Sequence, residues 1–203
     1  MGTAPQAWRA DAGDFDRIVE AFSRAALDEA VTAWILEDFP PDDFVAEFVP
    51  RTVERGLRDD EVWVAGADGE IWTVSIWQTL TSLQRFEEEA AETGAHAAQL
   101  PGVRPLQRSA YLTDLLAREH PREFPHSYVQ VMVTVPEHRG KGSGAAVLAD
   151  RVRACGAAGT PAFLEASTER SARLYAREGF VREGTPHQLP DNGPTLIPMW
   201  FRP

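Results

Sequence analysis

Two spacings of hydrophobic residues recur along the chain, one typical of helices and one typical of strands. Near the N-terminus, apolar residues repeat about every 3.6 positions in two stretches, which predicts a helix capped by Asp14 and a second helix from about Asp42. Residues 82–120 also follow a helical pattern, but they are more polar and are interrupted near Pro101. Helices are therefore expected in three separate parts of the first 120 residues.

Strand patterns lie between and after these helices. Residues 61–67 and 70–77 are rich in β-branched and aromatic residues, and Asp68-Gly69 between them is a typical hairpin turn. The other expected elements are strands at residues 8–10, 128–135, 161–165, 180–182 and 195–201, and helices over residues 140–155 and from Ser167 or Thr168 to Gly179. Hairpin connections early in the chain and a crossover helix later predict a mixed sheet.

Length and composition indicate one soluble domain. The chain has 203 residues, which fits one domain or one domain with an insertion. No apolar run approaches the ~20 residues of a membrane-spanning helix, and the first residues lack the pattern of a signal peptide. The single cysteine, Cys155, excludes an internal disulfide and a cysteine-based metal cage, and the histidines lack metal-ligand spacing. We expect a cytoplasmic protein that binds no metal and is a monomer or a homodimer.

The formal charge of −11 narrows the range of partners. A nucleic-acid-binding protein usually has a basic face, so this charge argues against that class. Negative charge attracts a cationic substrate over long range, although it equally serves to keep a protein soluble. We therefore expect no nucleic acid and no membrane partner, and a positively charged small molecule is compatible with the sequence.

The most informative segment follows an apolar strand pattern at residues 131–135. After a short loop, residues 140–144 read Gly-Lys-Gly-Ser-Gly and lead directly into an apolar helical pattern. The first turn of a helix presents unpaired backbone N–H groups and the positive end of the helix dipole, which together favour a phosphate group. The only lysine of the chain, Lys141, lies in this loop. The segment therefore predicts a binding site for a phosphate or a pyrophosphate.

Three kinds of glycine loop bind such groups, and their spacing separates them. A P-loop requires a glycine, four residues and then Gly-Lys-Ser/Thr, whereas here the first glycine is missing and Gly142 follows Lys141. A dinucleotide-binding fingerprint is closer, because residues 140–145 match its loose form and Glu165 lies at a suitable distance for a ribose. However, residues 136–139 separate the strand from the first glycine, and little chain remains for a doubly wound sheet.

The third pattern is Val-Pro-x-x-Arg-Gly-x-Gly-x-Gly, over residues 135–144. It resembles the acetyl-CoA motif of the GNAT superfamily of N-acetyltransferases. Tyr175, followed four residues later by Gly179-Phe180, is similar to the second landmark of that superfamily. The two landmarks in this order are more specific than either alone. Residues 60–80 and 118–182 further resemble the puromycin-acetylating members of the superfamily.

The resemblance implies a GNAT fold, an α+β fold in which a mixed, mostly antiparallel sheet of about six or seven strands is flanked by helices. Residues 1–203 would form this single domain, with residues 81–124 as a helical insertion on the substrate side. The implied activity moves the acetyl group of acetyl-CoA to an amine of a small molecule, antibiotic-like or biosynthetic, directly within a ternary complex. Two alternatives stay open: a protein or peptide N-terminal acetyltransferase, and a non-catalytic acyl-CoA sensor.

The same resemblance assigns roles to individual residues. Tyr175 is expected to give a proton to the departing CoA thiolate, and His126, Glu165 or water to take the proton of the amine. The candidates for substrate binding do not come from the resemblance, which fades around Trp34 and Phe39. They are Trp34, Phe39, Trp77 and Tyr128, whose aromatic rings suit an apolar pocket, although the tryptophans equally suit the core. Ser171 stands where family members often have an asparagine. The residues expected to bind acetyl-CoA are Val133, Thr134, Val135, Arg139, Gly140, Lys141, Gly142, Ser143, Gly144 and Ser171.

Overall fold

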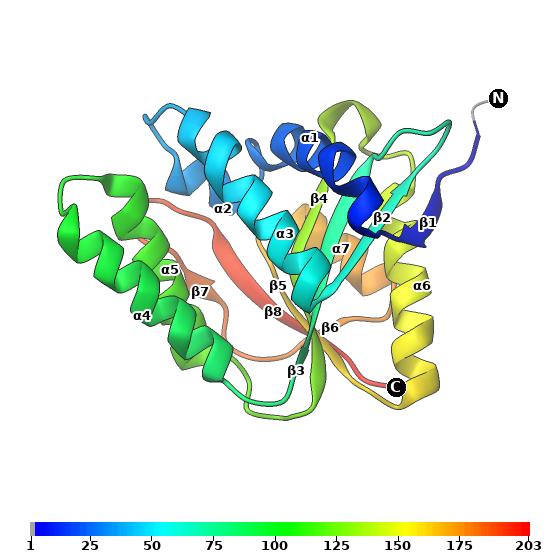
Figure 1. The fold of residues 1–203 in the computed structure, drawn as a ribbon. Coiled ribbons are helices and arrows are strands. Elements are labelled where there is room, and N and C mark those ends of the chain that lie inside the picture. Colours follow the sequence, from blue (N-terminus) through cyan, green and yellow to red (C-terminus); the bar gives the residue numbers. More distant parts are fainter. Residues whose placement is uncertain (1–2) are drawn as a thin grey trace.

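A single sheet runs through the centre of the molecule, with helices on both of its faces (Figure 1). The computed structural model describes residues 3–203. The strand order is β1-β2-β3-β4-β5-β8-β6, and β7 pairs with the other end of β8. Neighbouring strands are antiparallel, except that β4 and β5 are parallel. The strands are β1 (Gln6–Arg9), β2 (Glu61–Gly66), β3 (Thr73–Leu80), β4 (His126–Thr134), β5 (Ala162–Ala166), β6 (Val181–Arg182), β7 (His187–Gln188) and β8 (Thr195–Phe201).

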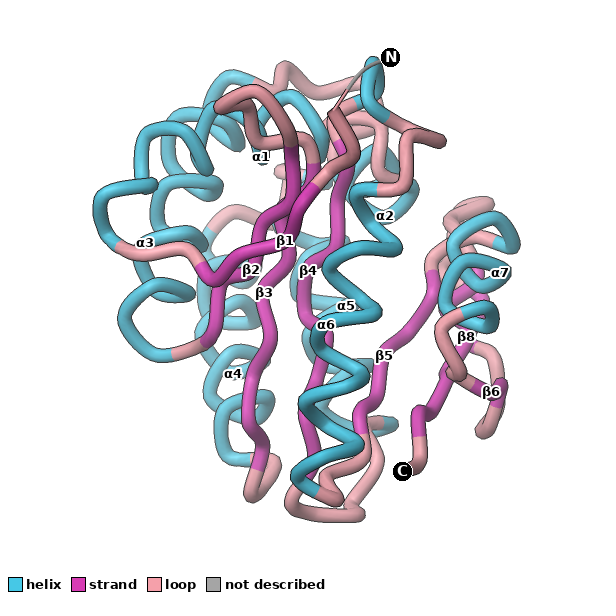
Figure 2. Tube along the Cα trace, turned by 90° about the vertical axis from the view of Figure 1, so that its right-hand side faces the viewer, coloured by secondary structure: helices cyan, strands magenta, loops and turns pink. Residues whose placement is uncertain are grey.

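The helices form two layers, one on each face of this sheet (Figure 2). On one face α1 and α3 pack against β2, β3 and β4, and the α4–α5 pair extends this layer. On the other face α6 and α7 pack. No helix of residues 3–203 is both long and apolar enough to cross a membrane. The helices are α1 (Phe15–Ala26), α2 (Ala30–Ile35), α3 (Val49–Asp59), α4 (Gln84–Gln99), α5 (Arg104–Glu119), α6 (Ser143–Ala158) and α7 (Glu169–Arg177), with short 3₁₀ turns at Ala12–Asp14 and Pro136–His138 and a π-helical turn at Phe44–Phe48.

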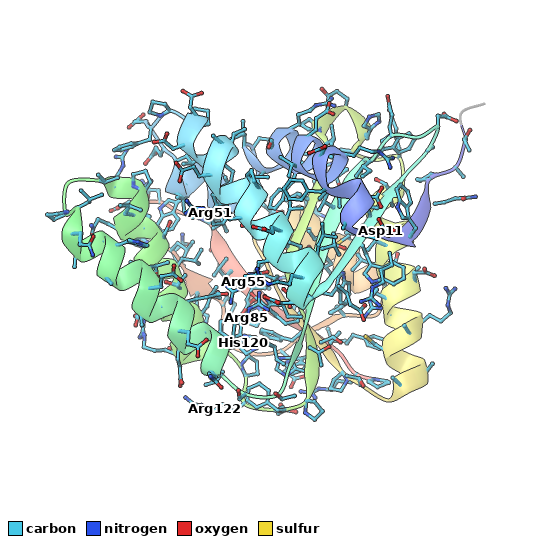
Figure 3. All side chains as sticks on the ribbon, viewed as in Figure 1. Asp11, Arg51, Arg55, Arg85, His120 and Arg122 are labelled. Atoms are coloured by element: carbon cyan, nitrogen blue, oxygen red, sulfur yellow. The ribbon has the colours of Figure 1, made fainter. Side chains whose placement is uncertain are left out.

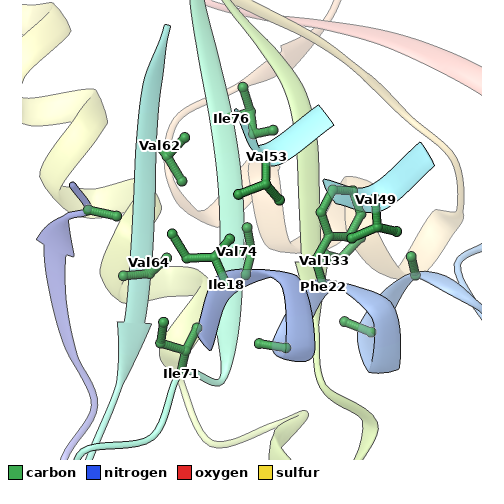
Figure 4. Close-up of a cluster of buried hydrophobic side chains, with 14 of the residues drawn as sticks. Ile18, Phe22, Val49, Val53, Val62, Val64, Ile71, Val74, Ile76 and Val133 are labelled. Atoms are coloured by element: carbon green, nitrogen blue, oxygen red, sulfur yellow. The ribbon is translucent and has the colours of Figure 1, made fainter. Parts of the chain in front are cut away.

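The main core lies between the sheet and the helices α1 and α3 (Figure 4). Ile18 and Phe22 are one turn apart on α1 and meet Val49 and Val53 of α3 above the strands. Ile76 of β3 packs from below and is fully buried. Burial of each such side chain contributes about 1.5–3 kcal/mol, so this layer holds α1 and α3 firmly against the strands that lead to the site.

The two parallel strands β4 and β5 pair only at their beginnings. Ser127 is opposite Ala162 and Tyr128 is opposite Phe163, and no further pair joins the strands in the described chain. Beyond this point the strands separate, as Figure 2 shows. Residues 129–134 still pair with β3, but their side toward β5 is unpaired and faces a space at the centre of the sheet, which we call the β4/β5 opening.

A β-bulge in β4 lies beside this opening. Ile76 pairs with Val131 and Trp77 pairs with Val129, so Gln130 is an extra residue in β4. The bulge reverses the alternation of side chains: Val131 packs with the α1 layer, whereas Val129 packs with the α6–α7 layer. As a result, the side chain of Tyr128 lies on the same face of the sheet as α4 and α5.

The fold confirms the predicted mixed, mostly antiparallel sheet, with eight strands rather than six or seven. The 61–77 hairpin is present, but its second strand begins at Thr73, because residues 67–72 form a wider loop in which Glu70 N donates to Ala67 O. Residues 82–120 form the expected helices with a break at Pro101. The short elements α2 and β7 are additional to the prediction.

Candidate functional site

The glycine loop adopts a backbone that side chains disfavour. Gly140 and Gly142 have φ values of +78° and +91°, and Gly142 is the N-cap of α6. The N–H groups of Ser143, Gly144 and Ala145 point out of the first turn and have no acceptor within residues 3–203. These donors lie at the positive end of a 16-residue helix and are suited to hold an anion, so we call them the anion site; binding of acetyl-CoA there stays a prediction.

Hydroxyl groups fix the start of α6 to the sheet. The Thr73 and Ser143 hydroxyls lie 2.8 Å apart, and the Thr73 and Thr134 hydroxyls also lie 2.8 Å apart. Thr73 and Ser143 are almost completely buried, so this chain of hydrogen bonds is well protected. The side chain of Ser143 is therefore used by the fold, and only its backbone N–H faces outward.

Arg139 is held by protein groups on three sides. Its Nε donates to the carbonyl of Thr134 (3.0 Å), and its two Nη atoms donate to the carboxylate of Asp28 (2.6 and 2.5 Å). The hydrogen bond from Arg139 lowers the pKa of Asp28. Arg139 thus ties the glycine loop to the turn between α1 and α2, and it leaves the loop N–H groups as the principal anion donors.

Lys141 lies exposed on the outer side of the loop. Its Nζ is 3.2 Å from Nδ1 of His138 and 5.4 Å from the centre of the Trp72 ring. His138 stacks on Trp72 with the ring centres 4.5 Å apart. Lys141 is therefore a solvent-facing cation at the edge of the anion site, where it can reach a phosphate as a mobile charge.

Tyr175 lies on α7, on the side of the sheet opposite α4 and α5. Its ring is buried with Ala166 and Val129, which border the β4/β5 opening, and its centre is 6.0 Å from that of Phe180. Burial raises the pKa of the Tyr175 hydroxyl, and the negative charge of Glu29 raises it further. Because its pKa is raised, the hydroxyl is protonated at neutral pH. It has no hydrogen-bond partner in the described chain and is therefore free to donate.

Ser171 helps to start the helix that carries Tyr175. The Thr168 hydroxyl accepts from Ser171 N (3.0 Å), and the Ser171 hydroxyl accepts from Thr168 N (3.2 Å), which is a capping box. The helix ends just before Gly179, whose φ is +94°. Ser171 therefore positions α7, and its hydroxyl already contacts Thr168.

Glu165 and Tyr128 meet across the two parallel strands on the other face. Glu165 is largely buried, which raises the pKa of its carboxyl to about 7 in spite of the Tyr128 hydroxyl beside it. Burial also raises the pKa of Tyr128, and the Glu165 charge adds to the effect. No basic side chain of residues 3–203 forms an ion pair with Glu165. A carboxyl with this pKa is suited to take up a proton near neutral pH.

A cavity of about 270 Å³ opens beside Glu165. It lies between α5, the strands β5 and β8, and the segment after β6. Its floor is aromatic, and carboxylates are the main charged groups in its wall. The lining residues are Leu115, Leu116, Glu119, Pro121, Glu123, Phe163, Glu165, Glu183, Gly184, Thr185, His187, Leu196, Pro198 and Trp200.

An ion network supports the cavity side of β3 and β4. Arg85 of α4 forms two hydrogen bonds with the Asp60 carboxylate (2.6 and 2.9 Å), and Glu89 joins Arg85 to Arg55 of α3 (3.3 and 2.9 Å). Figure 3 shows Arg55 and Arg85 close together between α3 and α4. In the orientation that satisfies its hydrogen bonds, Gln78 of β3 accepts from Arg85 Nη2 at 2.7 Å. The helices α3 and α4 are thereby fixed to β3, the strand that pairs with β4 at the bulge.

His126 does not line the cavity and lies behind its wall, next to Trp200. It is fully buried, its Nε2 is 3.0 Å from Nε2 of His120, and its Nδ1 donates to the carbonyl of Glu123 (2.6 Å). With Nδ1 protonated, Nε2 of His126 must accept from His120, so both rings are neutral. Burial lowers the pKa of both histidines, to about 3 for His120. The structure therefore places the candidate base Glu165 at the cavity, and not His126.

The tryptophans expected to bind substrate have other environments. Trp34 is buried beside Leu115 and donates from Nε1 to the carbonyl of Pro190 (2.9 Å). Trp77 is buried on the α6 side of the sheet, with Arg151 above its ring. Phe39 is partly exposed under Arg104. The cavity is not lined by Trp34, Phe39 or Trp77. Tyr128 does not line it either, but it contacts Glu165, which does.

The cavity wall contains residues that sequence reasoning missed. The 81–124 region supplies Leu115, Leu116, Glu119, Pro121 and Glu123, while its place on the substrate side stays a prediction. Residues 183–187 and the strand β8 supply the opposite wall, and they were given no role. Their sequence has no motif, because they reach the site only through the pairing of β8 with β5.

The fold of the chain is similar to that of several solved acetyltransferases. No protein-family model matches the chain. A Corynebacterium glutamicum protein described as a histone acetyltransferase and related acetyltransferase is 23% identical, with a TM-score of 0.66 over 99% of this chain and 97% of that one. The Drosophila melanogaster polyamine N-acetyltransferase is 16% identical, with a TM-score of 0.72 over 98% and 100%. The Aedes aegypti arylalkylamine N-acetyltransferase 2 is 13% identical, with a TM-score of 0.73 over 98% and 99%. Over essentially its full length, the chain therefore has the fold of the GNAT acetyltransferases.

Proposed function

We propose that this protein is an N-acetyltransferase that moves the acetyl group of acetyl-CoA to the amine of a small molecule, directly within a ternary complex. The observation that carries the proposal is the placement of three features around the β4/β5 opening. The anion site of α6 lies at one end, the Tyr175 hydroxyl lies on one face, and the Glu165 carboxyl lies on the other.

The residues at the opening fit acetyl-CoA. The N–H groups of Ser143, Gly144 and Ala145 suit its pyrophosphate, with Lys141 as an accessory cation. The unpaired edge of β4, around Val133, can pair with the amide groups of the pantetheine arm as a strand would. Acetyl-CoA supplies the activated acyl group, so the protein has only to bind it, orient the amine and move protons.

Glu165 is the proposed proton acceptor. An amine is mostly protonated at neutral pH and must lose a proton before its nitrogen can attack the thioester carbon. The raised pKa of Glu165 matches this task, and Tyr128 beside it orients the carboxyl. Glu165 accepts this proton first, and the neutral nitrogen then attacks. As the new C–N bond forms and the C–S bond breaks, the nitrogen loses its second proton to water.

Tyr175 is the proposed proton donor to the departing thiolate. Its hydroxyl is protonated, has no partner in residues 3–203, and lies on the side of the opening opposite Glu165. The proposed proton donor and the proposed proton acceptor are therefore on opposite faces of the sheet. Cys155 is buried at the far end of α6, so an acyl-cysteine route has no support.

A small amine is favoured over a peptide as the acceptor. The cavity volume of about 270 Å³ is at the lower end of small-ligand sites. Two proteins of similar fold are named as polyamine and arylalkylamine acetyltransferases, and both names describe small amines. No observation specifically favours an antibiotic acceptor or a protein that only senses acyl-CoA.

Release of free thiol from acetyl-CoA, measured with a panel of small amines and peptides, tests the proposal. We expect thiol release with small amines and formation of the N-acetyl product by mass spectrometry. Turnover with peptides alone would replace this proposal by a peptide acetyltransferase. Tight CoA binding without turnover on any amine would contradict catalysis.

A further inference from the structure

The cavity beside Glu165 contains four glutamates, two of which are already neutralised. Arg202 donates from Nη1 to Glu123 (3.0 Å) and from Nη2 to Glu183 (2.6 Å). These interactions lower the pKa of Glu183 and raise that of Arg202. Glu123 and Glu183 are therefore satisfied within the protein and have little need of a ligand.

The other two glutamates lack such a partner. Glu119 lies at the C-terminal end of α5, about half exposed, and His187 is its only neighbour within ion-pair range in the described chain, at 4.0 Å. Glu165 lies at the inner wall and is largely buried, yet no arginine, lysine or histidine of residues 3–203 pairs with it. A buried carboxylate without a cation is costly, so a ligand that brings a positive charge would be bound favourably here.

Apolar side chains make up much of the remaining cavity lining. Leu115, Leu116 and Leu196 line the cavity together with the rings of Phe163 and Trp200. A water molecule occupies about 30 Å³ in the liquid, so a cavity of about 270 Å³ holds on the order of eight to ten non-hydrogen atoms. Such a cavity suits a short hydrocarbon chain with a polar group at each end.

We propose that the acceptor is a small amine that carries a second positively charged group, with the reacting amine at Glu165 and the second cation at Glu119. The assignment of the reacting end rests on the proposed function. The preference for two charges is a property of the cavity and does not depend on turnover. Two matched charge contacts distinguish such a molecule from a monoamine, which leaves Glu119 without a partner.

Calorimetric binding of α,ω-diaminoalkanes and of 1-aminoalkanes with the same number of carbons, in the presence of CoA, tests this inference. We expect the best diamine to bind about tenfold more tightly than its monoamine, since one partly buried charge contact is worth roughly that factor. Glu119→Gln should abolish the difference by weakening only the diamine. Glu92→Gln, which removes one exposed carboxylate from α4, is the control for net charge and should leave the difference unchanged.

A second variant keeps the test informative. Glu119→Lys places a positive charge at the same point and is expected to make the diamine bind less tightly than the monoamine, while thermal unfolding shows that the chain is folded. Equal binding of diamines and monoamines to the unmodified protein would overturn the inference, as would an unchanged preference in Glu119→Gln. If diamines are preferred but no thiol is released, the acyl-transfer proposal fails and the two-charge cavity stands. If thiol is released equally with diamines and monoamines, the acyl-transfer proposal stands and the two-charge cavity fails.

Discussion

The carboxylate of Asp28 accepts two hydrogen bonds from the guanidinium of Arg139, at 2.6 and 2.5 Å. Asp28 follows α1, and Arg139 precedes the glycine loop, so the pair joins two segments that are distant in sequence. Because the guanidinium also holds the carbonyl of Thr134, it fixes the end of β4 and the turn after α1 at the same time. We therefore assign Arg139 to the shape of the anion site.

This assignment predicts a coupled effect of the two residues. Arg139→Lys keeps the charge but loses the two parallel hydrogen bonds, and we expect acetyl-CoA to bind about threefold to tenfold more weakly. Adding Asp28→Asn to this variant should have little further effect, because the partner contact is already lost. Calorimetry of the single and double variants measures the coupling. If the two substitutions instead weakened acetyl-CoA binding independently, so that their factors multiplied, the coupling would be contradicted. The control is Arg24→Lys, which changes the exposed Arg24–Glu137 contact near the same loop.

The backbone of Gly142 gives a second prediction. Its φ of +91° is rare for residues with a side chain and strongly unfavourable for β-branched ones. Gly142→Val should therefore rearrange the start of α6 and reduce acetyl-CoA binding below detection by calorimetry, while circular dichroism still shows a folded chain. Gly94→Ala in α4, where added atoms meet nothing within 4 Å, is the control. Binding of Gly142→Val with unmodified affinity would show that the loop backbone is not the anion site.

Features that depend on local sequence were predictable. The Asp68-Gly69 turn between two β-rich runs, and the glycines before α6, specify backbone conformations that few other residues adopt, and both are found as expected. The helix α2 was missed because a glutamate caps it: Glu29 accepts from the N–H groups of Val31 and Thr32, in place of the usual Ser, Thr, Asp or Asn.

Features that depend on strand pairing were not predictable. Glu165 and Tyr128 become neighbours only because β4 and β5 are parallel with one specific register. The bulge at Gln130 then decides which face of the sheet Tyr128 occupies, and no sequence signal marks a bulge at a glutamine. The aromatic character of Trp34 and Trp77 likewise suggests a pocket, but both side chains are used in the core. Burial, which distinguishes these cases, follows from the packing of distant segments.

Tyr175→Phe gives a third prediction, on the chemical step. The ring packing is preserved and only the hydroxyl is removed, so the acetyl-CoA affinity should be nearly unchanged. General acid catalysis contributes about 10²-fold or more, and we expect kcat to fall by about that factor. Single-turnover kinetics with acetyl-CoA already bound separates this step from product release. An unaltered kcat would remove the assigned role, and Tyr111→Phe, at an exposed site on α5, is the control.

The pH dependence of the reaction gives a fourth prediction. Burial raises the pKa of Glu165 to about 7, so the carboxyl is protonated below this pH and cannot accept a proton from the amine. We expect kcat/KM to increase about tenfold per pH unit below the pKa and to level off above it. In Glu165→Gln this inflection should be absent and the rate low throughout. Glu165→Asp, which retains a carboxyl, should restore an inflection with part of the rate. The same inflection in Glu165→Gln would assign it to another group.

The buried histidine pair gives a fifth prediction, on stability. Burial lowers the pKa of His120 from its usual 6.5 to about 3, and it also lowers the pKa of His126. Between these values the unfolded chain binds more protons than the folded one, so the free energy of unfolding should increase with pH. The contribution of the pair is complete above about pH 6.5 and is lost progressively as the pH falls towards 3.

Denaturant unfolding of His120→Gln between pH 4 and pH 8 measures this contribution. Glutamine can still donate a hydrogen bond to His126 Nε2 but does not titrate, so we expect a shallower dependence of the unfolding free energy on pH than in the unmodified protein. His96→Gln removes an exposed histidine from α4 and should leave the slope unchanged. An unchanged slope in His120→Gln would mean that burial does not keep His120 neutral in the folded protein.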